Sequence, residues 1–157
     1  IIGLKSLCLG NNQTALDHLN DFYTKWKNNS LVIEKWFEMM STLNLEGEGL
    51  NLIKALLKHK DFDYKNPNKL RSVLSTFQRE NILLFHANDS SGYKFISEQV
   101  AIIDKKNPQA AARLILPLTR FKNYSIERKN KIKSVLKSIN KPYISNDLSE
   151  IIEKSLI

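Results

Sequence analysis

The side chains best suited to nucleophilic or metal chemistry are few in this sequence and lie far apart. There are three histidines, at positions 18, 59 and 86, and one cysteine, Cys8. A zinc peptidase motif needs a His-Glu-x-x-His run on a helix, and none occurs. Cys8 has no cysteine or histidine at metal-ligand spacing, and we interpret it as a small buried side chain. The sequence therefore predicts no catalytic residue and no metal site.

Positive charge is the more conspicuous chemical feature. The chain carries a formal net charge of +8, from 24 basic and 16 acidic residues. Residues 65–157 hold 17 basic and 8 acidic side chains, and residues 120–141 hold eight basic side chains against one acidic, Glu127. Such a field attracts an anion, a nucleic acid or an acidic protein face. Runs of charge more often form a solvated helix face, which is the interpretation favoured here.

Length and composition limit the class of protein. The 157 residues are 42% hydrophobic, which is enough for a buried core. No apolar run approaches the roughly 20 residues that span a membrane, so no membrane association is expected. A lone cysteine forms no internal disulfide and fits a reducing compartment, which predicts a cytoplasmic location. The chain starts at Ile1 without a methionine, and we therefore expect a piece of a longer protein.

The elements that must position these side chains are helices. Apolar residues recur at helical spacing in almost every segment, whereas no alternating strand pattern persists. Thr14 and Asp17 form a start similar to a capping box, and Ser30 is a candidate N-cap. The predicted helices cover residues 14–27, 30–44, 50–59, 91–105, 125–140 and 146–157, with two more that begin after Asn66 and Asn107. The predicted fold class is all-α.

Two of these helix starts share the sequence Lys-Asn-Pro, at residues 65–67 and 106–108. Asparagine is a good N-cap, and proline at the first helical position loses no hydrogen bond. The two asparagines are 41 residues apart, near the period of HEAT and armadillo helix pairs. We therefore predict a HEAT/armadillo-like α-solenoid of stacked antiparallel helix pairs, with residues 1–157 as a single all-helical domain.

Aromatic and histidine side chains receive structural interpretations. His86 follows an apolar run and is predicted to be a hydrogen-bonded structural residue, while His18 and His59 are predicted to lie on helix surfaces. Five aromatic residues at helical spacing beside leucines are predicted to be core residues rather than a platform for base stacking: Trp26, Trp36, Phe37, Tyr93 and Phe95.

Several segments together form a recognisable pattern. The most specific are Asn-Pro-Asn-x-x-Arg-Ser at residues 66–72 and Asn-Pro-Gln-x-x-x-Arg-Leu at residues 107–114. Lys35-Trp36-Phe37, Phe85-His86-Ala87 and Ser91-Gly92-Tyr93 accompany them. In this order and spacing the segments resemble the end of bacterial aminopeptidase N, a zinc metallo-aminopeptidase family. The resemblance runs from about residue 14 to the C-terminus.

The resemblance implies a non-catalytic role for this chain. In the family, the zinc motif and the Gly-Ala-Met-Glu-Asn exopeptidase motif belong to an upstream catalytic domain, and neither is present here. The matching part is the end of a C-terminal superhelical domain that encloses the substrate chamber. The implied partners are the upstream catalytic domain and peptide substrates, and zinc is implied for the parent enzyme only. Arg71 and Arg113 match arginines that line the chamber near the distal end of the peptide.

A second hypothesis stays open beside this one. A free-standing HEAT-like adaptor would bind an acidic protein or a nucleic acid through the basic C-terminal half. The basic residues at 120–141 follow no recognisable nucleic-acid module, so nucleic-acid binding is not expected. The early position of Arg71 and Arg113 in helices with Asn-Pro starts favours the chamber hypothesis. A guanidinium at such a position can hold a peptide carboxylate through two hydrogen bonds.

Overall fold

The computed structural model describes residue 3, residues 13–139 and residues 143–157. Cys8, predicted to be buried, lies outside the described residues. Within the described part every regular element is a helix and there is no strand, which confirms the all-α prediction. No helix there is long and apolar enough to cross a membrane. The chain divides by its contacts into two compact units, Ile1–Leu84 and Phe85–Ile157, and each is described by itself.

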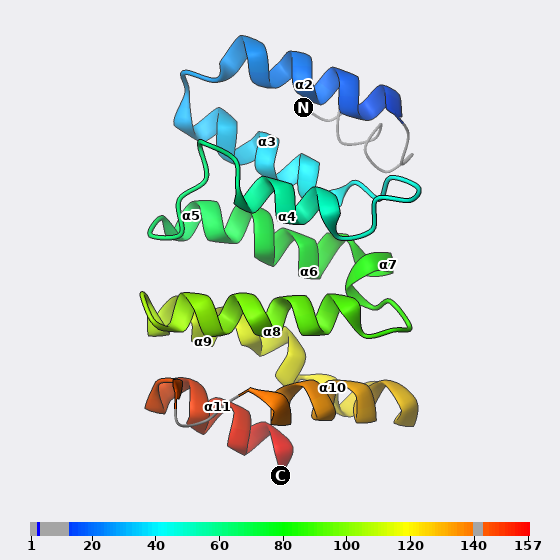
Figure 1. Cartoon of the computed structure of the whole chain (residues 1–157), viewed down its shortest axis with the longest axis vertical. Helices are drawn as coiled ribbons and strands as arrows, with labels where there is room; N and C mark the ends of the chain where they lie inside the picture. Colours follow the sequence, from blue (N-terminus) through cyan, green and yellow to red (C-terminus); the bar gives the residue numbers. More distant parts are fainter. Residues whose placement is uncertain (1–2, 4–12, 140–142) are drawn as a thin grey trace. The chain divides into compact units, whose positions relative to one another are not determined.

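The first unit is built around α3 (Ser30–Thr42). This helix packs against α2 (Gln13–Trp26) and α4 (Asn51–Leu57) (Figure 1). It also contacts α5 (Pro67–Leu70), the π-helical segment Arg71–Ser75 and α6 (Thr76–Glu80), which follow one another without a break. The short α7 (Ile82–Phe85) comes next. Each helix of the unit from α2 to α6 contributes apolar side chains to its core, among them Leu19, Ile33, Phe37, Ile53, Leu70, Val73 and Phe77.

Two helix starts in this unit differ from the prediction. The N-cap of α3 is Asn29 rather than Ser30, and the Asn29 side chain accepts hydrogen bonds from two N–H groups of the first turn. Helix α2 begins at Gln13, so Thr14 lies inside the helix and not at its cap. Asparagine and serine are nearly equal as N-caps, so local preference alone does not decide between neighbouring candidates.

The two Asn-Pro starts are confirmed. Asn66 accepts hydrogen bonds from the N–H groups of Asn68 and Lys69 at 2.9 and 3.3 Å. Asn107 accepts one from the N–H of Ala110 at 3.0 Å. In both helices a proline takes one of the first two helical positions. The asparagine oxygen satisfies N–H groups that have no partner within the helix, so both boundaries are set locally.

The second unit contains α8 (Ser91–Asp104), α9 (Pro108–Thr119), the 3-10 turn Phe121–Asn123, α10 (Ile126–Ser138) and α11 (Asn146–Leu156). Helix α9 packs against both α8 and α11, and α10 packs against α8 (Figure 1). The short connection between α8 and α9 makes them an antiparallel pair. The core of this unit includes Ile96, Val100, Leu114, Ile115, Ile132, Leu136, Leu148 and Ile152.

A buried carboxylate holds the start of α11 against the end of α8. Asp104 is 5% exposed and accepts hydrogen bonds from the N–H and the hydroxyl of Ser145, both at 2.6 Å. The same hydroxyl caps α11 by accepting from the N–H of Leu148 at 3.3 Å. These charge-assisted hydrogen bonds offset the cost of burying the Asp104 charge.

Most of the predicted core aromatics are buried, namely Trp36, Phe37, Tyr93 and Phe95. The prediction for Trp26 is wrong, because this side chain is 51% exposed. Trp26 is the last residue of α2, and the buried residues of that helix, Ala15 and Leu19, lie in its first half. The apolar periodicity therefore continues past the part of α2 that the core covers.

Candidate functional site

Arg71, predicted to line a substrate chamber, is the first residue of the π-helical segment. Here the N–H of Thr76 bonds to the carbonyl of Arg71, five residues back, instead of four. The Arg71 side chain is exposed, and its Nη2 donates to Oδ1 of Asn68 at 3.4 Å. Among the described residues no carboxylate forms an ion pair with it. Local π-helical turns are frequent at functional sites, and no sequence pattern predicted this one.

Arg113 is exposed on α9 and lines a groove of about 580 Å³ between α9 and α11. The groove is mixed in character, with apolar side chains and two charges of each sign. Its acidic residues belong to α11, where Glu150 forms an ion pair with Lys154. The remaining lining residues of the groove are Gln109, Ala112, Leu116, Asp147 and Ile151.

The two arginines belong to different units of the chain. Each guanidinium is exposed, so each is accessible within its own unit to a molecule outside the described chain. Their shared role in lining one chamber stays a prediction.

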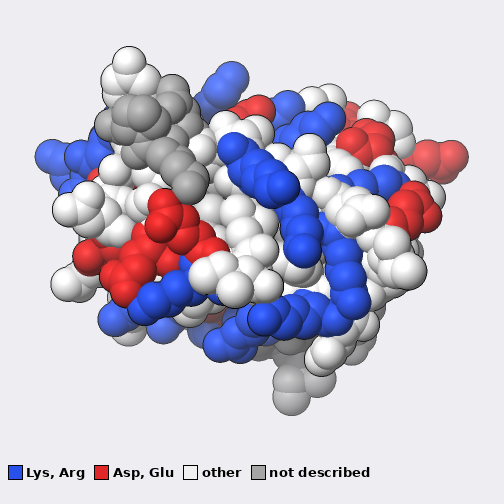
Figure 2. All heavy atoms as spheres, turned by 90° about the horizontal axis from the view of Figure 1, so that it is seen from below, with Lys and Arg blue, Asp and Glu red and all other residues white. Residues whose placement is uncertain are grey.

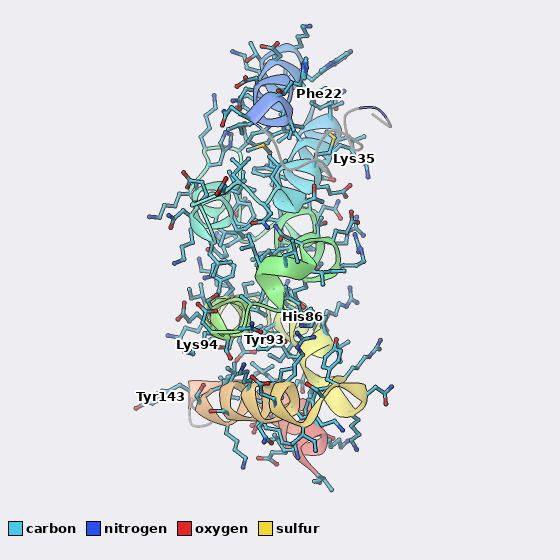
Figure 3. The ribbon with its side chains drawn as sticks, turned by 90° about the vertical axis from the view of Figure 1, so that its right-hand side faces the viewer. Phe22, Lys35, His86, Tyr93, Lys94 and Tyr143 are labelled. Atoms are coloured by element: carbon cyan, nitrogen blue, oxygen red, sulfur yellow. The ribbon has the colours of Figure 1, made fainter. Side chains whose placement is uncertain are left out.

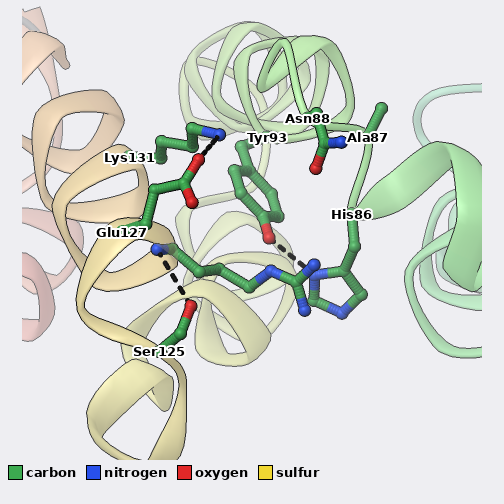
Figure 4. Close-up of a pocket in the computed structure, with 8 residues that line it drawn as sticks. His86, Ala87, Asn88, Tyr93, Ser125, Glu127 and Lys131 are labelled. Atoms are coloured by element: carbon green, nitrogen blue, oxygen red, sulfur yellow. Dashed lines mark hydrogen bonds and ion pairs between the residues drawn. The ribbon is translucent and has the colours of Figure 1, made fainter.

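A polar pocket in the second unit was not predicted from the sequence. Its walls come from the loop after α7, from α8 and from the first turns of α10 (Figure 4). Ser125 caps α10 by accepting from the N–H of Arg128 at 3.4 Å. This cap fixes where the helix begins, and the three-residue spacing of Arg128 and Lys131 then places both on one face. The pocket has about 50 Å³ of free volume and is lined by His86, Ala87, Asn88, Tyr93, Ser125, Glu127, Arg128 and Lys131.

His86 is hydrogen-bonded, as predicted. Its Nδ1 lies 2.6 Å from the hydroxyl of Tyr93, and the two side chains lie side by side (Figure 3). The imidazole also meets the ring of Tyr124 edge-on, with 5.4 Å between ring centres. Burial and the positive charge of Arg128 lower the pKa of His86, so that its imidazole is neutral near pH 7. Burial raises the pKa of Tyr93, which keeps the hydroxyl protonated.

The two cations of the pocket differ in their partners. Lys131 donates to Oε1 of Glu127 at 2.5 Å, and this hydrogen bond lowers the pKa of Glu127. Arg128 has no carboxylate within ion-pair distance in the described part of the chain. Its guanidinium carbon instead lies 5.8 Å from the centre of the Tyr124 ring, a cation–π contact. The pocket therefore holds two cations and one carboxylate, Glu127, and the carboxylate is paired with Lys131 and not with Arg128.

The basic stretch predicted at residues 120–141 lies mainly on α10. Lys129, Lys133 and Lys137 recur every four residues and so share one face of the helix. Figure 2 shows Lys and Arg side chains in a nearly continuous band on the face seen from below. Lys133 packs over the ring of Phe121, 5.7 Å from its centre. Lys141 lies outside the described residues.

His59 does not lie on a helix surface, contrary to the prediction. Helix α4 ends at Leu57, and the His59 ring packs against the rings of Tyr23, Trp36 and Phe37 at 5.1, 5.0 and 5.6 Å between centres. Packing against α2 and α3, which sequence periodicity does not show, leaves only 23% of this side chain exposed. His18, in contrast, is exposed on α2, as predicted.

Asp61 completes this aromatic cluster. Its N–H donates to Nδ1 of His59 at 3.2 Å, and its carboxylate accepts from the hydroxyl of Tyr23 at 2.5 Å. Burial and the hydrogen bond to Asp61 raise the pKa of Tyr23 to about 12. Burial likewise lowers the pKa of His59, although the nearby carboxylate opposes this effect. Because the rings contact one another directly, the cluster has a structural role.

No group of three or more His, Cys, Asp or Glu side chains that could hold a metal ion occurs in the part of the chain that the structure describes.

All 157 residues match the family described as "Domain of unknown function (DUF3458_C) ARM repeats". The chain belongs to this family. The description of the DUF3458_C family as ARM repeats agrees with the predicted HEAT/armadillo-like solenoid, and the resemblance stated from the sequence motifs is confirmed by the relatives below.

The chain is similar over 139 residues, 88% of its length, to three curated proteins named aminopeptidase N. It is 38% identical to the one from Haemophilus influenzae, 37% to that from Escherichia coli and 33% to that from Caulobacter vibrioides. It spans only 16% of the length of these relatives.

A solved structure shows the same fold. The crystal structure of Legionella pneumophila aminopeptidase A in complex with aspartic acid matches with a TM-score of 0.89 and 31% sequence identity. The match covers 98% of this chain and 18% of that protein.

Proposed function

We propose that this chain is a non-catalytic C-terminal helical domain of a zinc aminopeptidase, and that it walls the substrate chamber while the parent enzyme removes N-terminal amino acids from peptides. The observation that carries the proposal is the 33–38% identity to aminopeptidase N over 88% of the chain, which spans only 16% of those proteins. The catalytic domain would occupy part of the remaining length and would be the main partner of this chain.

Zinc belongs to that catalytic domain in this proposal. The side chains of the present chain are proposed to act on the peptide and not on the metal. The location proposed for the parent enzyme is the cytoplasm, which agrees with the single cysteine in the sequence.

Arg71 and Arg113 are the residues proposed to contact the peptide. Both are exposed, and neither has an ion-pair partner among the described residues. Each guanidinium would hold a carboxylate at the distal end of the peptide through two charge-assisted hydrogen bonds. Binding energy from this remote part of the substrate is then available at the reacting bond. A chamber closed by this wall would admit peptides and exclude folded proteins.

The test compares two substrates in the full-length parent enzyme. In Arg71→Ala and Arg113→Ala, kcat/KM for a long peptide should fall by about 5- to 150-fold, which corresponds to about 1–3 kcal/mol of charge-assisted hydrogen bonding. A single-residue chromogenic substrate is too short to reach either guanidinium and should keep its kcat/KM. Arg79→Ala and Arg120→Ala, which remove exposed arginines from the same two units, are matched controls.

Equal losses on both substrates, with unchanged folding, would contradict the contact role of the two arginines.

A separate measurement addresses the absence of catalysis. The purified 157-residue chain should hydrolyse no aminoacyl-anilide, with or without added zinc. Activity that stays with the chain in gel filtration and disappears with a chelator would contradict the proposal.

One observation favours the alternative function of an adaptor. Lys and Arg side chains form a band on one face of the molecule (Figure 2), and α10 carries several lysines. A nucleic acid bound there would release counterions, so its affinity would fall steeply with salt concentration. The adaptor function is tested by measuring the affinity for a labelled oligonucleotide over a series of salt concentrations. The unsubstituted 157-residue chain is compared with a triple variant, Lys129→Gln, Lys133→Gln, Lys137→Gln. Under the aminopeptidase proposal, binding at physiological salt should be no tighter than the non-specific range of about 10⁻⁴–10⁻⁶ M.

A further inference from the structure

The polar pocket between the loop after α7, α8 and α10 has no part in the function proposed above. All of its lining residues belong to the second unit. Its free volume of about 50 Å³ exceeds what a single water needs, roughly 10–15 Å³ by the same measure. A group the size of a carboxylate therefore fits inside, whereas a whole side chain of a large residue does not.

The charges of the pocket select the sign of the ligand. Lys131 and Glu127 are paired with one another at 2.5 Å and largely cancel. Arg128 has no such partner among the described residues and rests against the Tyr124 ring. One unbalanced positive charge favours a monoanion. A doubly charged phosphate would leave one negative charge without compensation and close to Glu127.

The shape of the groups selects the chemistry of the ligand. A guanidinium presents two parallel N–H donors that match the two oxygens of a carboxylate. Ser125 and Asn88 add a hydroxyl and an amide, which are neutral hydrogen-bond donors at the same pocket. We propose that this pocket binds a single carboxylate group, held by the guanidinium of Arg128 with Ser125 and Asn88 as neutral hydrogen-bond partners.

His86 gives the proposal a readout of its own. The groups that face its imidazole are Tyr93 from α8, Tyr124 from the turn before α10, and Arg128 from α10. Since the charge of Arg128 lowers the pKa of His86, a carboxylate bound to Arg128 would offset that charge and raise the pKa. The chain has only three histidines. His18 on α2 and His59 in the aromatic cluster therefore serve as internal references.

The experiment is a titration of the 157-residue chain, labelled with ¹³C at histidine, with sodium acetate at constant ionic strength. The helical circular dichroism spectrum is recorded first. The His86 resonance should shift and saturate, and its pKa should be higher with acetate than with chloride, while His18 and His59 stay unchanged. Arg128→Gln should weaken the response at least about tenfold, because the guanidinium is lost. Arg120→Gln, which removes an exposed arginine of the same unit, should leave it intact.

A second variant protects the test against a folding defect. Arg128→Lys keeps the positive charge and loses the two parallel N–H donors of the guanidinium. Acetate should therefore bind this variant more weakly than it binds the unsubstituted chain and more tightly than it binds Arg128→Gln. Identical responses of all three histidines, or an unchanged response in both Arg128 variants, would overturn the proposal. So would equal responses to chloride and acetate.

The source of the carboxylate is a separate comparison. Acetyl-Gly-Gly carries one carboxylate at the end of a peptide, and its amide carries none. The acid should shift His86 and the amide should not. Tighter binding of the acid than of acetate would assign the pocket to the end of a peptide, and equal or tighter binding of acetate would assign it to a small free carboxylate. An amide that binds as well as the acid would refute a carboxylate site of either kind.

Discussion

His59 in the first unit and His86 in the second are both half-buried imidazoles packed against aromatic rings. Burial is the largest cause of a lowered pKa in each. The nearest charge differs in sign, because the carboxylate of Asp61 raises the pKa of His59 whereas the guanidinium of Arg128 lowers that of His86. The same side chain is thus held in a closed cluster in one unit and at the edge of a small pocket in the other.

The hydrogen bonds of the two imidazoles reinforce this difference. Nδ1 of His59 accepts from a backbone N–H, which can only donate, so protonation of Nδ1 would break the bond. Nδ1 of His86 faces the hydroxyl of Tyr93, which can donate to a neutral ring or accept from a charged one. Protonation of His59 at Nδ1 therefore exchanges the backbone bond for the Asp61 carboxylate 3.8 Å away, whereas His86 keeps the same hydroxyl partner in both protonation states.

The largest expected effect is a loss of folding stability when a residue of the aromatic cluster around His59 is replaced. Phe37 is fully buried beside His59, so Phe37→Ala should lower the free energy of unfolding by about 3–5 kcal/mol, from lost burial and the cavity left behind. Arg128→Gln at the pocket should lower it by only about 0.5–1 kcal/mol, because the cation–π contact with Tyr124 is lost. Denaturant unfolding, followed by circular dichroism, measures both.

Tryptophan fluorescence sharpens this measurement. Trp26 and Trp36 both lie in the first unit, so fluorescence follows that unit while circular dichroism follows both. If Phe37→Ala moves the fluorescence transition ahead of the circular dichroism transition, the two units unfold separately. A loss for Phe37→Ala as small as that for Arg128→Gln would contradict the distinction between a closed cluster and an open pocket.

The same contrast explains what could be predicted from the sequence. The Asn66 and Asn107 helix starts depend on residues adjacent in the chain, and both predictions are confirmed. The environment of His59 depends on rings from α2 and α3, and the contact between Arg128 and the His86 pocket depends on where α10 packs. Periodicity identifies which face of a helix is apolar, but it does not say which distant residue meets that face.

The π-helical segment at Arg71 could not be predicted from the sequence either. A π-turn accommodates one extra residue in a helix whose composition is otherwise ordinary, so it has no signature in residue type. The exposure of Arg71 and Arg113 is visible in the structure, whereas their shared function rests on the family resemblance and stays a prediction.

The second prediction compares two tyrosine hydroxyls. Tyr23→Phe removes a hydrogen bond of 2.5 Å to the carboxylate of Asp61 and should cost about 1.5–3 kcal/mol, the range for a bond to a charged group. Tyr93→Phe removes a bond of 2.6 Å to a neutral imidazole and should cost about 0.5–1.5 kcal/mol. Denaturation midpoints at a constant m-value give both numbers. The reverse order would show that the His86 pocket, and not the His59 cluster, is the more rigid of the two.

The third prediction concerns pH. Both histidines have a folded-state pKa below the unfolded value of about 6.5. Between the lowered pKa and about 6.5 the unfolded chain binds more protons, so stability rises with pH there. Each histidine thus contributes stability that is complete above about pH 6.5 and is lost as the pH falls through that window. His86→Asn should remove part of this slope, and His59→Asn a separate part, when unfolding is measured from pH 5 to pH 7.5. A pH dependence unchanged in both variants would show that neither pKa is lowered.

The smallest expected effect separates the two histidines by a ligand. If acetate binds beside Arg128, it stabilises the folded chain by RT ln(1 + [L]/Kd), about 0.4 kcal/mol when its concentration equals Kd. It should also raise the pKa of His86 toward the unfolded value and so reduce the His86 part of the pH dependence. The His59 part should not change, because the nearest carboxylate there is Asp61 and is already in place. The measurement is unfolding from pH 6 to pH 7.5 in acetate and in chloride at equal ionic strength, where acetate is fully ionised and the other carboxylates do not titrate. A reduction that survives in His86→Asn would come from a general anion effect, and it would mean that acetate does not distinguish the His86 pocket from the His59 cluster.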